Sequence, residues 1–232
     1  MSSAHDQRIL VLLSGRGSNY RALMQARQNG RLQGEIVAVI SDRIDAAGLG
    51  LAREDGVDTV CVERRRYPDR DSFESALRVA VSGFDAHWIV LAGFMRVLSA
   101  GFVQDHQGRM VNIHPSLLPR HRGLQTHQRV LEAGEQEHGA SVHFVTPELD
   151  SGPVISQVVM PVAPGDSPDR LAERLLPLEH RLLPATVALL LSEPVELRDE
   201  TISIQNQVLQ RPLLLGSDLS DHGRLLGARW HT

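Results

Sequence analysis

Short apolar runs that recur through the first half of the chain are the feature that most constrains its fold. Most of them are separated by intervals long enough for a helix, and one interval places Phe73, Leu77 and Val81 at helical spacing. Buried strands that alternate with helices are typical of a parallel sheet covered on both faces. The expected strands are Ile9 to Leu13, Ile36 to Ile40, Val57 to Val62, Trp88 to Leu91 and Met110 to Ile113. The sequence therefore predicts an α/β protein with an open, mostly parallel, twisted sheet.

The next part of the chain predicts two more strands and a long helix. Ser141 to Val145 and Val154 to Val162 are apolar enough to be buried strands, and Ser167-Pro168 is a favourable start for the amphipathic helix that follows. Pro177 lies inside that helix. Because proline lacks the N–H that a helix needs, we expect a kink or a break near Leu176.

From residue 193 onward the apolar pattern weakens. A hairpin over Val195 to Leu197 and Thr201 to Ile204 is expected, and residues 193–232 are otherwise a C-terminal extension of unknown role. Removal of the residues after about Arg198 is expected to leave a folded, active protein, because the motifs described below lie upstream. The opposite outcome requires that the run Leu213-Leu214-Leu215 pack on the core.

The composition excludes several classes of protein. The chain has 232 residues, of which 42% are hydrophobic and 22% are charged, and its net charge of −4 provides no general attraction for nucleic acid or an anionic membrane. Cys61 is the only cysteine, which excludes an internal disulfide and a cysteine-based zinc site. No apolar run approaches the ~20 residues of a membrane span. We expect a cytoplasmic protein whose partners are small molecules, with neither a nucleic acid nor a membrane among them.

A glycine-rich turn follows the first expected strand. Gly15 and Gly17 let the backbone turn tightly, and the free N–H groups of the helix that starts at Ser18-Asn19 favour an anion. Tyr20 stands where a dinucleotide fingerprint needs its third glycine. The turn thus indicates a mononucleotide or a sugar phosphate rather than NAD, although a plain strand-to-helix turn would use the same glycines.

A second motif lies at the end of the fifth expected strand. Asn112 and His114 are two residues apart, so they share a face at the carboxyl end of the sheet, where open α/β folds bind ligands. An amide and an imidazole there can stabilise an oxyanion and donate a proton, or they can be structural. Asp150 could orient the histidine and stabilise its protonated form, although an Asp near Gly-Pro often serves only to form a turn. Since the histidines lack metal-ligand spacing, no metal is expected.

Taken together, these segments resemble the phosphoribosylglycinamide formyltransferase family in order and in spacing. The segments that carry the resemblance are Gly15 to Asn19, Ala92 to Arg96, Asn112 to Pro119, Ser141 to Val145 and Asp150 to Pro153. The resemblance implies a formyltransferase-like fold with a Rossmann-type N-terminal half. The formyltransferase domain would span residues 8–192, with a mononucleotide-binding half at 8–111 and a folate cleft at 112–192.

The resemblance also implies roles for individual residues. Those expected at the reacting carbonyl are Asn112, His114 and Asp150. Those expected to bind the phosphate and ribose of the acceptor are Gly17, Ser18, Asn19 and Glu179. Those expected to contact the folate are Arg70, Met95, Arg96, Val97, Leu98 and Asn112.

The implied reaction moves a formyl group from 10-formyltetrahydrofolate to the amine of glycinamide ribonucleotide, in de novo purine biosynthesis. It needs no metal, and the protein would be a monomer or a homodimer. The alternatives are a formyltetrahydrofolate hydrolase and a catalytically silent folate-binding protein. The sequence departs from the family pattern at two of its positions: Gln125 replaces a frequent histidine, and Pro177 lies within a helix. We expect both departures to affect the binding of the acceptor more than the reaction.

Overall fold

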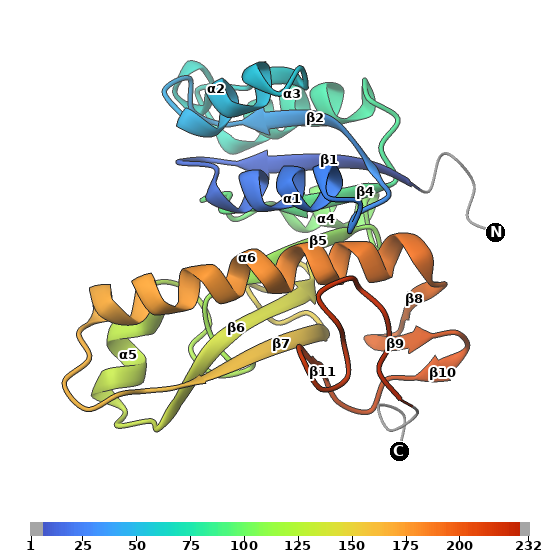
Figure 1. Ribbon diagram of the computed structural model, residues 1–232. Helices are drawn as coiled ribbons and strands as arrows, with labels where there is room; N and C mark the ends of the chain where they lie inside the picture. Colours follow the sequence, from blue (N-terminus) through green and yellow to red (C-terminus); the bar gives the residue numbers. More distant parts are fainter. Residues whose placement is uncertain (1–6, 228–232) are drawn as a thin grey trace.

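The computed structural model describes residues 7–227, which form a large sheet with helices on both faces and a smaller sheet at one end (Figure 1). The first seven strands are β1 (Arg8–Leu13), β2 (Glu35–Ser41), β3 (Asp58–Cys61), β4 (Trp88–Leu91), β5 (Met110–His114), β6 (Glu137–Phe144) and β7 (Val154–Pro161). The helices are α1 (Ser18–Gln28), α2 (Ala47–Glu54), the short 3-10 helix η2 (Arg64–Arg66), α3 (Arg70–Ser82), α4 (Ala100–Asp105), α5 (Thr126–Glu132) and α6 (Pro168–Ser192).

The large sheet has eight strands in the order β11-β7-β6-β5-β4-β1-β2-β3, where β11 is Leu213–Leu214. Strands β1 to β5 are parallel, and β6 is antiparallel to both of its neighbours. The prediction of an open, mostly parallel sheet with helices on both faces is confirmed. Strand order reverses between β1 and β4, so the loops at the carboxyl ends of these strands diverge and leave room for a ligand.

The alternation of side chains along β1 divides the core between the two faces of the sheet. Ile9, Val11 and Leu13 belong to the cluster that α1 and α6 cover, whereas Leu10 and Leu12 belong to the cluster under α3 and α4. All five are fully buried. A strand buried on both faces needs a continuous apolar sequence, which is why the first strands could be recognised from their composition.

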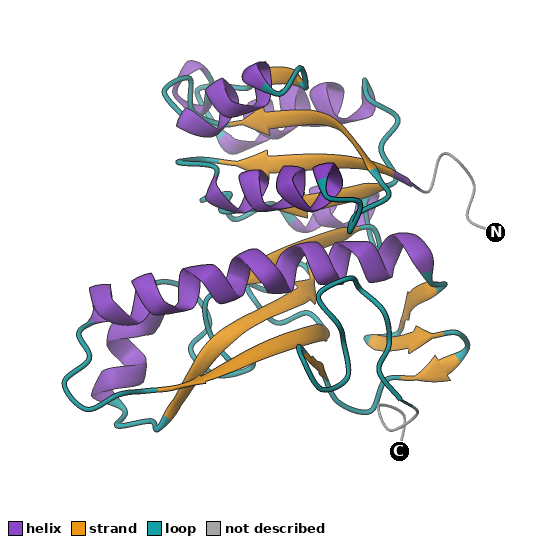
Figure 2. Cartoon of the chain, in the orientation of Figure 1, coloured by secondary structure: helices purple, strands orange, loops and turns teal. Residues whose placement is uncertain are grey.

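Helix α6 lies across one face of the sheet, over β6 and β7 and beside α1 (Figure 2). It begins where the Ser167 side chain accepts a hydrogen bond from the Arg170 N–H, and it continues to Ser192 through Pro177 and Pro184. The helix does not break near Leu176, because Leu171, Leu175 and Leu182, on either side of Pro177, are buried in the core. By length and composition α6 could cross a membrane, but 61% of its most apolar window is buried inside the protein, as in a core helix.

The C-terminal segment belongs to this core rather than extending away from it. Its hairpin is present as β8 (Val195–Arg198) and β9 (Thr201–Ile204), joined by β10 (Gln207–Val208) in a three-stranded sheet. The chain then adds β11 to the edge of the large sheet, parallel to β7. Leu213 and Leu219 are fully buried in the cluster that α6 covers. The expectation that these residues are dispensable is therefore revised, because their removal would expose α6 and β7.

We predict that Leu213→Ala lowers the free energy of unfolding by about 2–5 kcal/mol, the usual cost of truncating a buried leucine. Truncation after Arg198 should give insoluble protein. Urea unfolding followed by circular dichroism measures the first effect, with Leu226→Ala as the matched control because Leu226 is 42% exposed. A soluble truncated protein of wild-type stability would contradict the assignment of the segment to the core.

Candidate active site

His114 ends β5, and both nitrogens of its buried ring face acceptors. Its Nδ1 lies 3.4 Å from Asp150 Oδ2, and its Nε2 lies 3.0 Å from the carbonyl oxygen of His121. A neutral imidazole carries one N–H and can donate to only one of these oxygens. The ring is thus held between the Asp150 carboxylate and the backbone of the loop at His121.

Asp150 is held against His114 by the backbone. The Gly123 N–H donates to Asp150 Oδ2 at 2.8 Å, and Asp150 itself has a φ of 48°, in the left-handed region that Asp tolerates better than most residues. The distance of 3.4 Å between His114 Nδ1 and Asp150 Oδ2 confirms that the two side chains lie side by side, as expected. The other oxygen of Asp150, Oδ1, lies 3.8 Å from His143 Nε2, and Asp150 also lines the cavity beside the histidine.

His143 orients Asn112, and sequence analysis did not single it out. Its Nδ1 lies 2.8 Å from the Phe144 carbonyl oxygen, which can only accept, so Nδ1 carries the proton of the neutral ring. Its Nε2 then accepts a hydrogen bond from Asn112 Nδ2 at 3.1 Å. Burial holds the pKa of His143 well below its usual range, so the ring stays neutral near pH 7. The second N–H of the Asn112 amide remains available for a ligand.

A cavity next to this cluster brings together several of the residues expected to contact the folate. Its lining residues are Leu91, Phe94, Arg96, Val97, Leu98, Val103, Asn112, His143, Val145, Thr146, Pro147, Leu149 and Asp150. The apolar members can pack on a flat ring, and the polar members lie at the end where Asn112 and Asp150 are. Met95 is not among them. Its side chain is 68% exposed, and its N–H donates to Ser14 Oγ at 2.8 Å.

A basic cavity adjoins the first and shares Arg96 and Val97 with it. Arg64 and Arg70 supply two more guanidinium groups. Arg70 donates to Glu74 at 2.9 Å and Arg96 donates to Asp42 at 2.6 Å, so buried carboxylates fix both arginines in place. Burial raises the pKa of Glu74, but hydrogen bonds from Ser99 and Arg70 outweigh it and leave that pKa below its usual value.

The glycine-rich turn has the geometry of an anion cradle. Gly17 has a φ of 76°, and a Cβ there would lie 2.6 Å from the Gly48 Cα, so only glycine fits. Gly17 is also the N-cap of α1, and no side chain caps this helix end. The first N–H groups of α1, from Ser18 onward, are therefore left for a ligand.

Asn19 and Glu179 meet beside the cradle, although they are far apart in the sequence. Asn19 Nδ2 donates to Glu179 Oε2 at 3.3 Å, while Asn19 Oδ1 is buried without a hydrogen-bond partner among the described residues. Burial raises the pKa of the Glu179 carboxyl above its usual value. Both groups thus hold unused hydrogen-bonding capacity at the amino end of α1.

Gln125 is the other residue that departs from the family pattern. It has a φ of 58° and is the N-cap of α5, with no side-chain hydrogen bond to that helix. In residues 7–227, no group of three or more His, Cys, Asp or Glu side chains has the geometry to hold a metal ion.

Comparison with known proteins identifies the family. The formyl transferase family model matches residues 7–187. Phosphoribosylglycinamide formyltransferase of Escherichia coli is 44% identical over 180 residues, which cover 78% of this chain and 85% of that protein. The chain belongs to the phosphoribosylglycinamide formyltransferase family.

Two further relatives extend the comparison. The phosphoribosylglycinamide formyltransferase of Coxiella burnetii is 42% identical, and its crystal structure superposes with a TM-score of 0.83 over 87% of this chain and 95% of that one. The human trifunctional purine biosynthetic protein adenosine-3 is 40% identical over 82% of this chain, but this match covers only 19% of that protein. This formyltransferase thus shares both sequence and fold with its relatives across the region that contains the site.

We predict that Glu179→Gln stabilises this formyltransferase while weakening the binding of its acceptor. A carboxyl whose pKa is raised by folding costs stability when it is ionised, so the gain should be present near neutral pH. It should vanish as the pH falls below the usual pKa of a glutamate. The KM for the acceptor should rise roughly tenfold or more, the loss expected for a hydrogen bond to a charged group.

Thermal unfolding at neutral and acidic pH, together with steady-state kinetics, measures both effects. Glu173→Gln is the matched control, because Glu173 is an exposed glutamate of the same helix. A Glu179→Gln protein that is less stable than wild type at neutral pH would contradict the electrostatic argument.

Proposed function

We propose that this formyltransferase moves the formyl group of 10-formyltetrahydrofolate to the amine of glycinamide ribonucleotide, and that Asn112, His114 and Asp150 carry out the transfer. The observation that carries the assignment of residues is the contact between Asp150 and His114, at the edge of a cavity that Asn112 also lines. A donor amide, an imidazole and a carboxylate around one point are groups that can catalyse acyl transfer to an amine.

The folate would occupy the apolar cavity, with its formyl group toward Asn112. Arg96, Val97 and Leu98 line the wall. The carboxylate-bearing end of the folate would lie at the adjoining basic cavity, where Arg64 and Arg70 offer fixed positive charge. Met95 lies next to this wall in the sequence. Its side chain is exposed, and its backbone N–H donates to Ser14 Oγ.

Glycinamide ribonucleotide would bind with its phosphate at the cradle. Gly17, Ser18 and Asn19 would contact the phosphate through backbone N–H groups and the Asn19 side chain. Glu179 would accept a hydrogen bond from a ribose hydroxyl, which suits a buried carboxylate with one oxygen toward Asn19. This placement leaves the amine of the acceptor free to reach the centre at the end of β5.

In the transfer, the amine nitrogen attacks the formyl carbon, a new C–N bond forms and negative charge develops on the formyl oxygen. The free N–H of Asn112 and the His114 imidazole would stabilise that oxygen. Asp150, which lines the cavity, would accept the proton that the amine loses. The bond to the folate nitrogen then breaks, and that nitrogen takes up the proton.

Absorbance of the folate, followed with and without glycinamide ribonucleotide, tests this function. Loss of the formyl group only in the presence of the acceptor is the expected result. Deformylation without the acceptor would indicate the hydrolase, and no reaction under either condition would indicate a binding protein.

We predict that Asn112→Ala lowers kcat by about 10²–10³, the usual loss for one oxyanion donor. The KM for the folate should change less, because the cavity wall is intact. His143→Phe is a useful companion variant: it removes the acceptor that orients Asn112 and should lower kcat by a smaller factor. A normal kcat with only a raised KM in Asn112→Ala would make Asn112 a ground-state contact instead.

A further inference from the structure

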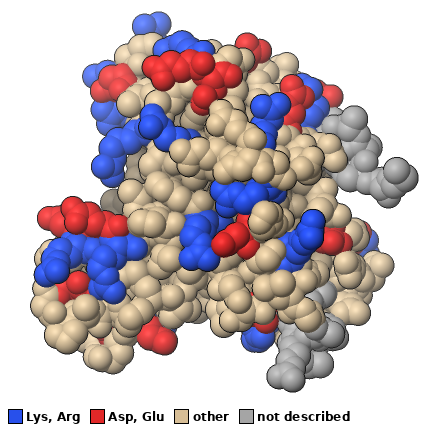
Figure 3. Space-filling view, in the orientation of Figure 1, with Lys and Arg blue, Asp and Glu red and all other residues tan. Residues whose placement is uncertain are grey.

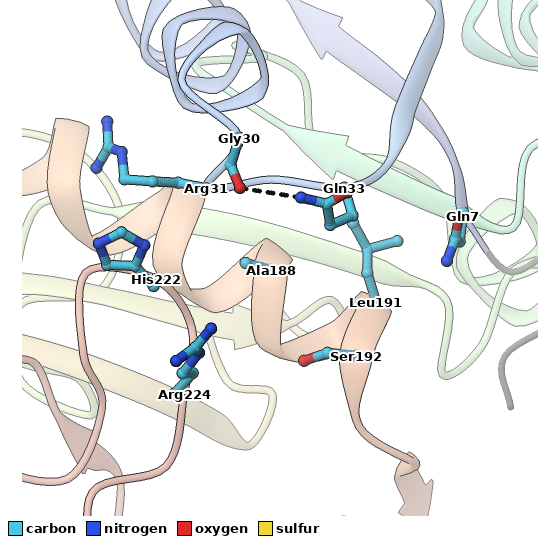
Figure 4. A pocket seen from close by; sticks show the side chains of 9 residues that line it. All are labelled: Gln7, Gly30, Arg31, Gln33, Ala188, Leu191, Ser192, His222 and Arg224. Atoms are coloured by element: carbon cyan, nitrogen blue, oxygen red, sulfur yellow. Dashed lines mark hydrogen bonds between the residues drawn. The ribbon is translucent and has the colours of Figure 1, made fainter.

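A second pocket, of about 280 Å³, lies at the seam between the first half of the protein and the C-terminal segment (Figure 4). It is lined by Gln7, Gly30, Arg31, Gln33, Ala188, Leu191, Ser192, His222 and Arg224. The loop after α1, the end of α6 and the chain beyond β11 thus form its three walls. None of these residues belongs to the site described above. His222 and Arg224 also lie outside residues 7–187, the part that the family model matches.

The pocket is positively charged, and its charges are not neutralised by described residues. Arg31, His222 and Arg224 lie on one side of it, whereas Leu191, Ser192 and Gln7 lie on the other (Figure 4). No carboxylate lines it. The guanidinium groups of Arg31 and Arg224 form no hydrogen bond or ion pair within residues 7–227. In the space-filling view, basic side chains lie over the middle of this face, with acidic ones beside some of them (Figure 3).

The nearest carboxylates in the sequence are already paired. Both oxygens of Asp221 accept hydrogen bonds from Arg181, at 3.1 and 3.2 Å. Glu35 accepts one from Arg8 at 3.3 Å. The carboxyl ends of α1 and α6 add partial negative charge nearby, each about half a unit, which two full guanidinium charges exceed. Among residues 7–227, the guanidinium groups of Arg31 and Arg224 are therefore open to an external anion.

We propose that this pocket binds a small phosphate-bearing metabolite, at a site separate from that of the acceptor. The forked guanidinium group matches the geometry of a phosphate, and the chain contains no lysine to substitute for it. Ser192 offers a hydroxyl, and the apolar Ala188 and Leu191 offer a surface for the rest of the molecule.

The site differs in position from the phosphate cradle of the acceptor. The cradle is at the amino end of α1, and the pocket includes Gly30 beyond its carboxyl end. A helix of 11 residues separates the two ends by about 16 Å, so one phosphate cannot reach both. Because Arg31 belongs to the first half and Arg224 to the C-terminal segment, a bound ligand would join the two and stabilise the packed segment.

Calorimetric titration at low ionic strength tests the proposal, with AMP as a phosphate monoester and inorganic phosphate as the minimal probe. The variants are Arg31→Gln, Arg224→Gln and the double substitution. Arg198→Gln is the matched control, since it removes the same charge from an exposed arginine of β8. Each single substitution should weaken binding at the pocket about tenfold or more, and the double variant should retain only the site at the cradle.

Hydrogen exchange of the unmodified protein provides a second measurement that does not depend on a variant. AMP should slow exchange in the segment around His222 to Arg224. Titrations that are identical in wild type and in the folded double variant, or exchange in this segment that AMP leaves unchanged, would overturn the proposal.

Discussion

The antiparallel pairing of β5 with β6 fixes the position of nearly every polar group in the centre. Its register sets Asn112 opposite His143 and His114 opposite Ser141. Ser141 Oγ then accepts from the Leu118 N–H and donates to the Ser116 carbonyl, which ties the loop after β5 to the middle of the sheet. That loop continues to His121 and Gly123, whose backbone groups contact His114 and Asp150. A shift of one residue in this pairing would turn each of these side chains to the other face.

Around this centre, two polar groups lack the partners that would stabilise them in the folded protein. The half-buried carboxyl of Glu179 has Asn19 as its one hydrogen-bond partner among residues 7–227, and no side chain caps the helix end at Gly17. Each costs stability in the absence of a ligand. By contrast, Arg70 and Arg96 are each fixed by a buried carboxylate, so their positions do not depend on a ligand. The unpaired groups gather where we place the acceptor, and the paired ones where we place the folate.

The sequence predicted the strands of the first half because their two-sided burial demands continuous apolar residues, and it predicted where Asn112 and His114 would lie because they end such a strand. It could not identify His143 as a partner, since which strand lies beside β5 depends on the folded topology. Strand β11 is only two residues long and follows a weak pattern, so its place in the sheet was missed. The helix continues through Pro177 without the break that proline can cause, because burial of the surrounding leucines outweighs one lost helical hydrogen bond.

The central claim of this account is that Asp150, in contact with His114, takes part in the transfer. The kcat of Asp150→Asn tests it most directly, with nitrogen-15 NMR of histidine-labelled protein on the same samples to show that the centre is intact. We expect kcat to fall by about 10² or more, while His143 carries a single proton, on Nδ1, in both proteins. An Asp150→Asn protein with an intact centre and the kcat of wild type would contradict the account.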